Sequence, residues 1–363
     1  MSLADSTLNF SAGPAILPQP VLEQAQADIR DLHGTGIGAM EHSHRGAAFT
    51  RVIEEARADC RAVGSIPDDF EILFLQGGAS SMFAFLPMNL LPADRCADYI
   101  HTGAWTKKAI ADAERLGDIR TIWDGTSCGF NHLPQNDELQ HSDDPRYTYY
   151  CSNNTIYGTM WPTPPTSRGW LINDASSEMF SRPIDWTCHD VVYAGAQKNL
   201  GPAGVTLLII RRELLEEANQ SLPSMFRFDL HAKNGSCLNT PPTFGIHVMG
   251  LVFKWILDQG GLDAMSIHNE SKANVLYDAI DHSGGFYTGH AHPNCRSTMN
   301  VTFTCPNPEL DAAFLDKALA SGMQNLKGHR SIGGLRASIY NAFPVEGCHR
   351  LAALMDEFAQ QHG

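Results

Sequence analysis

One lysine in the chain lies in surroundings that suit covalent chemistry. Lys198 follows an apolar run, residues 191–194, and precedes another, residues 205–210, with alanines and glycines close by. Small neighbours let a bulky group approach the amine, and glycines let the backbone turn sharply beside it. A free lysine has a pKa of about 10.4 and becomes a nucleophile near neutral pH only when burial or a nearby cation lowers that value. By itself, a lysine between two strands is more often an ordinary loop residue.

A carboxylate changes this interpretation. Asp174 ends another apolar segment, residues 170–173. If both apolar segments are parallel strands, Asp174 and Lys198 emerge at their carboxyl ends, in the same crevice. This arrangement suits pyridoxal phosphate, because the lysine would form a Schiff base with the cofactor and the carboxylate would keep the pyridine nitrogen protonated. The alternative is a non-catalytic protein that binds a phosphate-bearing ligand, in which Lys198 only neutralises Asp174.

A candidate phosphate site follows the apolar residues 72–75. Gln76, Gly77 and Gly78 form a turn before Ala79 and Ser80, which begin an apolar helix. Free backbone amides and the helix dipole both face an anion at such a helix start. The pattern is neither a P-loop nor GxGxxG, so nucleotide binding is disfavoured.

Two basic clusters stand out in a chain with a net charge of −14. One spans residues 41–46 and the other spans residues 328–336. Their basic members are His42, His44, Arg45, His329, Arg330 and Arg336. Arginine suits bidentate binding of carboxylates and phosphates, so we interpret both clusters as anion sites, the alternative being arginines that pair with surface acids. We expect no metal site at His42 and His44, nor at His290 and His292.

The composition excludes several classes of protein. The acidic balance argues against a nucleic-acid partner or an anionic membrane. Nine scattered cysteines without a CxxC pair fit reduced thiols. Residues 1–10 lack the features of a signal peptide, and the longest apolar run is too short to span a membrane. We therefore expect a cytoplasmic protein.

The elements that must position these residues form an α/β pattern. Its 363 residues exceed one ordinary core. Expected strands lie at residues 72–75, 97–101, 147–151, 170–173, 191–194, 205–210, 299–303 and 335–340. A helix from Pro20 is expected to place Val21, Leu22, Ala25, Ile29 and Leu32 on one face. We predict a large domain at residues 17–259 and a small C-terminal domain at 260–363, which the N-terminal segment 1–16 joins.

These motifs together resemble a known family, the phosphoserine aminotransferases, which are fold type I enzymes dependent on pyridoxal phosphate. The resemblance runs from residues 10–14 to residues 338–342 and is strongest at Asp174 to Ser177 and at residues 194–199. It implies a large domain with a mostly parallel seven-stranded sheet, a small C-terminal α/β domain, and a homodimer with shared active sites.

The resemblance also implies roles for single residues. Lys198 and Asp174 would be catalytic. The cofactor would be bound by Ala79, Ser80, Trp105, Thr155, Asp174, Gln197 and Lys198, with Asn239 and Thr240 supplied by the partner subunit. The substrate would be bound by Ser11, His44, Arg45, His329, Arg330 and Arg336. Trp105 would stack on the pyridine ring, Thr155 would contact its phenolic oxygen, and Ser80 stands where some relatives have arginine.

The implied reaction is amino transfer between L-glutamate and 3-phosphohydroxypyruvate, which gives 2-oxoglutarate and O-phospho-L-serine in serine biosynthesis. Use of the phosphohydroxythreonine precursors of vitamin B6 stays open. The alternatives within enzymes are relatives of the glyoxylate aminotransferase or cysteine desulfurase type. The cluster around His329 and Arg330 argues against both, because neither substrate carries a second strong anion.

Overall fold

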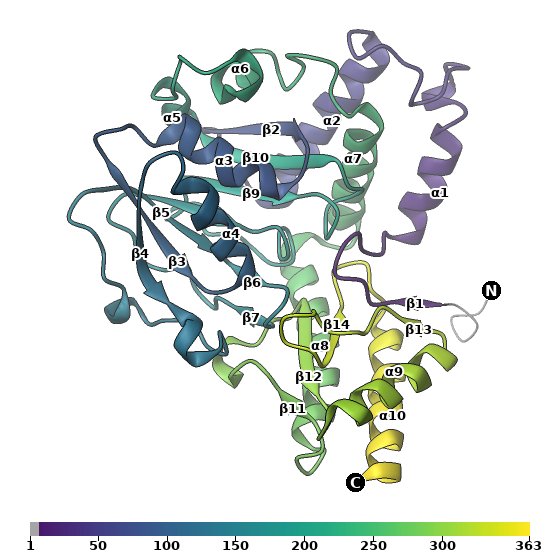
Figure 1. Ribbon diagram of the computed structural model, residues 1–363. Helices are drawn as coiled ribbons and strands as arrows, with labels where there is room; N and C mark the ends of the chain where they lie inside the picture. The colour runs from purple at the N-terminus through teal and green to yellow at the C-terminus, as the bar shows by residue number, and fades with distance from the viewer. Residues whose placement is uncertain (1–6) are drawn as a thin grey trace.

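The computed structural model describes residues 7–363, which contain a large seven-stranded sheet and a smaller three-stranded sheet (Figure 1). The order of the large sheet is β2 (Phe70–Gln76), β10 (Val205–Arg211), β9 (Val191–Gly195), β8 (Trp170–Asp174), β5 (Pro145–Cys151), β3 (Cys96–His101) and β4 (Asp118–Asp124). The small sheet contains β11 (Thr288–Gly289), β12 (Asn300–Thr304) and β14 (Leu335–Ser338). Two short pairs join β1 (Leu8–Asn9) to β13 (Met323–Gln324), and β6 (Asn153–Asn154) to β7 (Thr159–Met160).

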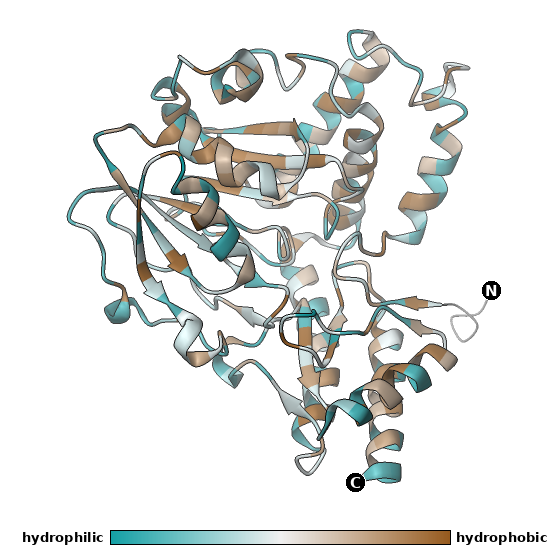
Figure 2. Cartoon of the chain, viewed as in Figure 1, coloured by the Kyte–Doolittle hydropathy of each residue, from teal (hydrophilic) through white to brown (hydrophobic). Residues whose placement is uncertain are grey.

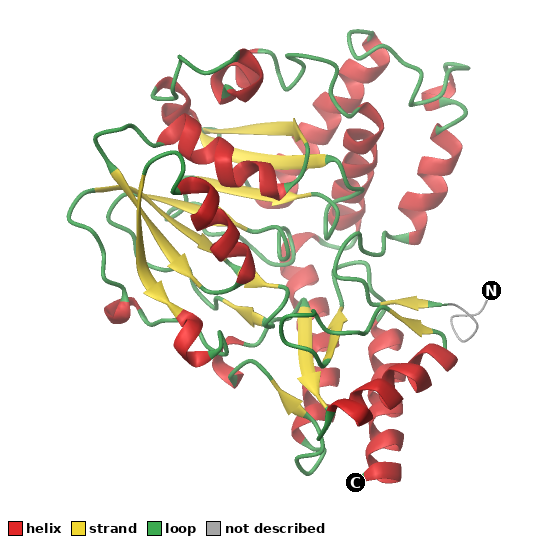
Figure 3. Cartoon of the chain, in the orientation of Figure 1, coloured by secondary structure: helices red, strands yellow, loops and turns green. Residues whose placement is uncertain are grey.

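Helices cover both sheets (Figure 3). They are α1 (Gln19–Asp28), α2 (Ala47–Gly64), α3 (Ala79–Leu90), α4 (Ala104–Ala113), α5 (Arg212–Glu216), α6 (Phe228–Lys233), α7 (Thr243–Asp258), α8 (Gly261–Asp281), α9 (Pro308–Ala320) and α10 (Val345–His362). Within residues 7–363, none of them combines the length and the apolar character that a membrane span requires.

The large sheet is mostly parallel, as predicted. Strands β4, β3, β5, β8 and β9 pair in parallel, whereas β10 pairs antiparallel with both β9 and β2. Strand β10 therefore runs against the others. Its residues 205–210 are all buried, and β2 and β10 are brown along most of their length in Figure 2. A strand covered on both faces reads as a continuous apolar run, which is why the sequence predicted it.

Alternation along β10 divides the large domain into two cores. Leu207 and Ile209 join the core that contains α2 and α7, whereas Leu208 and Ile210 join the core that contains α3. Successive side chains on a strand point to opposite faces, so one strand serves both layers. The carboxyl ends of the parallel strands, where Asp174 lies, are thereby held in a rigid frame.

The N-terminal segment belongs to the smaller core. Leu8 and Phe10 are buried with Phe343 and Leu351, and β1 pairs in parallel with β13. The predicted boundary at residue 260 falls between α7 and α8. Helix α8 contributes residues to the core around α2 and α7 and also to the smaller core. The domain boundaries therefore stay a prediction.

The prediction for the first helix was wrong in part. Leu22 and Ile29 are 44% and 40% exposed, whereas Val21, Ala25 and Asp28 are buried. The buried face includes an aspartate because Asp28 is paired with His247 of α7. An apolar periodicity count could not detect that pairing.

Candidate active site

Asp174 and Lys198 lie at the carboxyl ends of neighbouring parallel strands. Asp174 is the last residue of β8 and is in register with Tyr193 of β9, and Lys198 follows the end of β9. The loop after β9 is closed by hydrogen bonds from the amides of Leu200 and Gly201 to the carbonyl of Ala196. This turn directs Lys198 to the strand ends, and the structure brings the two predicted catalytic residues into one site.

The carboxylate of Asp174 is buried and held in one orientation. Its Oδ1 accepts hydrogen bonds from the amide of Ser176 at 3.0 Å and from the Ser176 hydroxyl at 2.5 Å. The Tyr149 hydroxyl donates to Oδ2 at 3.4 Å and shares a 2.8 Å hydrogen bond with the Tyr193 hydroxyl. Among the residues that the structure describes, Oδ2 accepts only this long hydrogen bond, so it keeps the capacity to accept a stronger donor.

Burial lowers the pKa of Lys198, whose amine donates to Thr155 Oγ1 at 3.0 Å. Asp174 and Cys151 oppose that decrease, whereas the nearby Arg336 guanidinium adds to it. A lower pKa increases the neutral fraction of the amine at neutral pH, which is the form that acts as nucleophile and base.

An aromatic face and a helix start complete this side of the site. The ring centroid of Trp105, in the first turn of α4, lies 5.6 Å from Lys198 Nζ, and its buried Nε1 has no hydrogen-bond partner. Ala79 and Ser80 begin α3, where backbone amides lack partners within the helix. Gly195 has no room for a side chain, because a Cβ there would lie 2.8 Å from Gln197 Oε1 and 3.2 Å from the amide of Ala79. Gln197 and Ala79 therefore lie beside the end of β9.

The N-terminal segment passes over the lysine. The amide of Ala15 donates to the carbonyl of Gln197 at 2.9 Å, and a Cβ on Gly13 would lie 3.3 Å from Lys198 Cγ. Ser11, which the sequence assigned to substrate, lies in this segment and accepts a 3.4 Å hydrogen bond from the amide of Gly13.

Arg336 brings a partly buried cation to the site. Its Nε is buried without a hydrogen-bond partner, and burial lowers the pKa of its guanidinium. Within residues 7–363, no carboxylate forms an ion pair with it. Burial together with Arg336, Arg330 and Lys108 lowers the pKa of His329. These cations therefore make the electrostatic potential of one region positive, which suits an anionic ligand.

Two predicted groups lie elsewhere in the chain. His44 and Arg45 lie in the loop between α1 and α2, a segment at the upper right of Figure 1, and in the described part of the chain no hydrogen bond or ion pair joins them to Lys198. Asn239 and Thr240 precede α7, where the carbonyl of Thr240 accepts a 3.1 Å hydrogen bond from Gln76 Nε2. Their assigned roles stay predictions.

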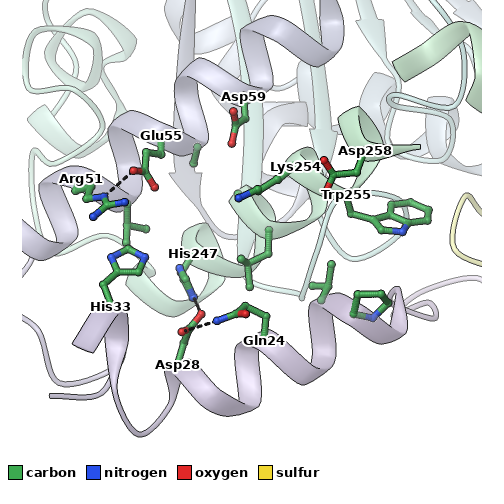
Figure 4. A pocket seen from close by; sticks show the side chains of 16 residues that line it. Gln24, Asp28, His33, Arg51, Glu55, Asp59, His247, Lys254, Trp255 and Asp258 are labelled. Carbon is green, nitrogen blue, oxygen red and sulfur yellow. Dashed lines mark hydrogen bonds and ion pairs between the residues drawn. The ribbon is translucent and has the colours of Figure 1, made fainter. Parts of the chain in front are cut away.

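A separate cavity of about 440 Å³ lies between α1, α2 and α7 (Figure 4). His247 and Asp28 form a 2.8 Å hydrogen bond at its floor, and Gln24 donates to Asp28 at 2.9 Å. Neither Lys198 nor any other predicted site residue lines it. Among residues 7–363, no group of three histidine, cysteine or acidic residues is placed to hold a metal.

Comparison with known proteins identifies the relatives of this chain. The family model for class V aminotransferases matches residues 7–351. Phosphoserine aminotransferase of Herpetosiphon aurantiacus is 50% identical over 98% of this chain and 99% of the relative. The solved phosphoserine aminotransferase of Bacillus circulans subsp. alkalophilus is 45% identical, with a TM-score of 0.97 over 99% of this chain and 100% of that chain. A further structure, of the radiation-damaged Schiff base in phosphoserine aminotransferase, has 44% identity and a TM-score of 0.96 over 98% and 100% of the two chains.

The chain belongs to the class V aminotransferases.

The residues of this class V aminotransferase fit pyridoxal phosphate. Lys198 offers an amine whose only hydrogen-bond partner among the described residues is Thr155. Asp174 offers an oriented carboxylate, Trp105 an aromatic face with an unpartnered Nε1, and the start of α3 a pair of backbone amides for a phosphate. These groups match the aldehyde, the ring nitrogen, the ring face and the phosphate of that cofactor.

The residues of the aminotransferase that orient this set were not predicted from its sequence. Ser176 and Tyr149 hold Asp174, and Tyr340 donates to the carbonyl of Ala12 at 2.9 Å. The tyrosines were interpreted only as strand residues, because their partners lie far away in the sequence. The one available signal was the serine two residues after Asp174.

Proposed function

We propose that the chain catalyses reversible amino transfer between L-glutamate and 3-phosphohydroxypyruvate, giving 2-oxoglutarate and O-phospho-L-serine. The enzyme is a transaminase that depends on pyridoxal phosphate. The observation that carries the proposal is the partly buried guanidinium of Arg336, which pairs with no carboxylate among residues 7–363 and lies close enough to Lys198 to lower the pKa of its amine. Arginine in such a position binds a carboxylate through charge-assisted hydrogen bonds.

Pyridoxal phosphate, when bound, supplies an aldehyde that bonds covalently to amines and a ring that withdraws electrons from the substrate Cα. Lys198 Nζ accepts the Cα proton as a general base and returns it as a general acid. The decrease in its pKa through burial favours the first of these steps. Asp174, fixed by Ser176, would accept a hydrogen bond from the ring nitrogen of the cofactor and so keep that nitrogen protonated.

The basic loop that contains His329 and Arg330 supports a substrate with two anionic ends. Arg336 holds the α-carboxylate, and the loop holds the phosphate of phosphoserine or the distal carboxylate of glutamate. His329 shares the field of Arg336 and Arg330, as the causes of its lowered pKa indicate. Glyoxylate lacks a distal anion. With glyoxylate as the substrate, His329 and Arg330 would have no anion to bind.

The homodimer is part of this proposal. His44 and Arg45 lie apart from Lys198 within one chain, and His44 Nε2 is buried without a partner. We infer that Asn239 and Thr240 complete the cofactor phosphate site of the partner subunit, and that the partner's anion loop contributes to substrate binding. We also expect a cytoplasmic location, which the nine free cysteines support.

Half-reaction spectroscopy tests the proposed function. The purified protein with pyridoxal phosphate is mixed with O-phospho-L-serine, L-glutamate, L-serine or L-alanine, and the visible absorbance is followed. We expect phosphoserine and glutamate to convert the cofactor to its amine form, and serine and alanine to do so far more slowly. Borohydride should fix the cofactor mass on Lys198. Equal rates with phosphoserine and alanine would contradict the assigned substrate, and a protein without a visible band would support the binding-protein alternative.

A further inference from the structure

The side chain of Asn199 joins the turn after β9 to the segment after β14, the strand that contains Arg336. Asn199 follows Lys198 directly, and its Oδ1 accepts a hydrogen bond from the backbone amide of Asn341 at 3.0 Å. Its Nδ2 donates to the sulfur of Met299 at 3.6 Å. Both asparagines are buried, so water does not replace these partners. One side chain therefore connects the turn of the lysine with the strand of the arginine.

The segment between β14 and Asn341 is held without slack. In β14, Arg336 lies opposite Thr302 of β12 in antiparallel register. The buried Nζ of Lys272, in α8, then donates to the carbonyls of residues 339 and 340 at 2.9 and 2.7 Å. Because these contacts fix the backbone on both sides, a displacement of Asn341 is transmitted to Arg336.

The side chain of Asn341 anchors the same segment a second time. Its Nδ2 donates to the carbonyl of Phe180 at 2.8 Å, and its Oδ1 accepts from Asn269 Nδ2 at 2.9 Å. Phe180 lies in the turn that follows Asp174. The segment after β14 thus contacts the turns that follow both predicted catalytic residues.

The lysine itself keeps its place without the side chain of Asn199. Two backbone hydrogen bonds to the carbonyl of Ala196 close its turn, and its amine donates to Thr155 Oγ1 at 3.0 Å. Neither set of contacts uses the side chain of Asn199. Its removal should therefore displace Arg336 more than it displaces Lys198.

We propose that Asn199 is a positioning residue that, through the amide of Asn341, fixes the guanidinium of Arg336 relative to the amine of Lys198. The substrate Cα and its carboxylate must reach these two groups at the same time, and a misplacement of about 1 Å costs about a hundredfold in rate. The inference deepens the proposed function, on which it rests for the role of Arg336 in binding the α-carboxylate.

Steady-state kinetics in a double-mutant cycle tests the proposal. Asn199→Ala should reduce kcat/KM for phosphoserine by about ten- to a hundredfold, because the guanidinium is misplaced. In the Arg336→Ala background, the same change should cost less than about threefold more, because no guanidinium remains to be placed. Full loss from Asn199→Ala in both backgrounds would overturn the proposal.

Asn89→Ala is the matched control. Asn89 is buried at the end of α3, and its Oδ1 accepts a hydrogen bond from the backbone amide of Phe228 at 3.0 Å, as Asn199 does from Asn341. Both variants therefore leave one buried amide without its acceptor, but Asn89→Ala should leave kcat/KM unchanged. An equal loss of kcat/KM in the two variants would show that Asn199 acts only through stability, and would overturn the proposal.

Hydrogen exchange measured by mass spectrometry tests the placement without a substrate. In full-length Asn199→Ala, residues 335–341 should exchange faster than in the wild type, because the amide of Asn341 loses its acceptor. Asn199→Asp keeps an acceptor oxygen at this place and should restore the slow exchange, and Asn89→Ala should not change it. Unchanged exchange of residues 335–341 in Asn199→Ala would overturn the proposal, whatever the half-reactions show.

Failure of the proposed function can be told apart from failure of this inference. If the half-reactions favour another amino acid over phosphoserine, the proposed substrate is wrong. The cycle is then run with the favoured amino acid, because every α-amino acid carries the carboxylate. If Asn199→Ala does not fold, Asn341→Ala replaces it, because that variant removes the contacts with Phe180 and Asn269. A loss from Asn341→Ala that is as large with Arg336→Ala as without it would then overturn the proposal.

Discussion

Lys198 combines two requirements that oppose each other. The amine must be accessible to a bulky cofactor, yet its pKa must be lowered by burial. Alanines and glycines around it meet the first requirement, and the strand ends and the N-terminal segment meet the second.

Replacement of Lys198 should therefore remove chemistry without harming the fold. Lys198→Ala should lower turnover by about two to four decades, the range expected for loss of a general base. The midpoint of thermal unfolding, measured by circular dichroism without cofactor, should stay near the wild-type value. Lys254→Ala, at an exposed lysine in α7, is the control and should keep full turnover. Turnover near wild type in Lys198→Ala without added amines would contradict the mechanism.

The two arginines should separate the two ends of the substrate. Arg330→Ala should reduce kcat/KM for phosphoserine selectively, and Arg336→Ala should reduce it for both phosphoserine and serine. Charge-assisted hydrogen bonds contribute about 1.5–3 kcal/mol each, so loss of two contacts corresponds to roughly two to four decades in kcat/KM. Steady-state kinetics with both amino acids checks this. An equal loss on serine and phosphoserine in Arg330→Ala would place that arginine elsewhere.

Residues with local signals could be predicted from the sequence, and residues that depend on distant partners could not. Lys198 and Asp174 each follow an apolar strand, so their meeting followed from parallel strand geometry. Tyr340 gave no such signal, because its partner Ala12, far away in the sequence, is set by the tertiary fold.

At the scale of elements, the loop between β13 and β14 groups its charges by turning sharply. Gly333 and Gly334 have φ values of 69° and 64°, and the amide of Gly328 donates to the carbonyl of Gly334 at 2.8 Å. Glycine adopts this left-handed backbone without strain. The turn keeps His329 close to Arg336.

Removal of one of these cations should change the titration of His329. The pKa of His329 lies below its usual value because of burial and then Arg336, Arg330 and Lys108. Cationic neighbours disfavour the imidazolium, so Arg330→Ala should raise the pKa, and binding of a dianionic phosphate should raise it as well. NMR titration of the His329 Cε1 proton measures both changes. Arg120→Ala, on β4, is the control and should leave the pKa of His329 unchanged. An unchanged pKa of His329 in Arg330→Ala would show that the charge of Arg330 does not act on His329.

The pair at the floor of the cavity in Figure 4 joins α1 to α7. His247→Ala should reduce the free energy of unfolding by about 1–3 kcal/mol, because the side chains of His247 and Asp28 are only 6% and 5% exposed and Asp28 would lose a buried partner. Urea unfolding measures the change. Arg51→Ala removes an exposed ion pair with Glu55 in the same cavity. It should change the free energy of unfolding by less than about 0.5 kcal/mol. Equal losses in both variants would contradict this account.

At the scale of the whole molecule, the shared site predicts complementation between inactive parents. Lys198→Ala and a double variant of Asn239 and Thr240 should each be inactive. When they are unfolded and refolded together, about half of the dimers should be mixed, each with one intact site, which gives roughly a quarter of wild-type activity. Activity after refolding of each parent alone is the control. No recovery under conditions that restore the wild type would exclude a site built from two chains.

Six strands of the large sheet could be predicted because they are largely buried and carry apolar runs, whereas the count of seven came only from the family resemblance. Strand β4 was missed, since only Ile122 of its residues 118–124 is fully buried at this edge of the sheet. The sequence of β4 lacks the apolar run or the alternation that marks a strand, whereas β2 at the other edge of the sheet has an apolar run. The N-terminal pairing of β1 with β13 was equally invisible, because two residues carry no periodicity.

That pairing has a consequence for the order in which a ribosome delivers the chain. Leu8 and Asn9 pair with Met323 and Gln324, and β2 must wait for β10, more than a hundred residues later, before its ladder forms. Contacts between segments so distant in sequence form late, because the intervening chain must first be made and closed into a loop. Phe10 and the apolar β2 therefore stay without their final partners through most of synthesis. Nascent chains arrested before residue 205 should bind a chaperone that recognises exposed hydrophobic segments. Full-length chains released from the ribosome should not bind it.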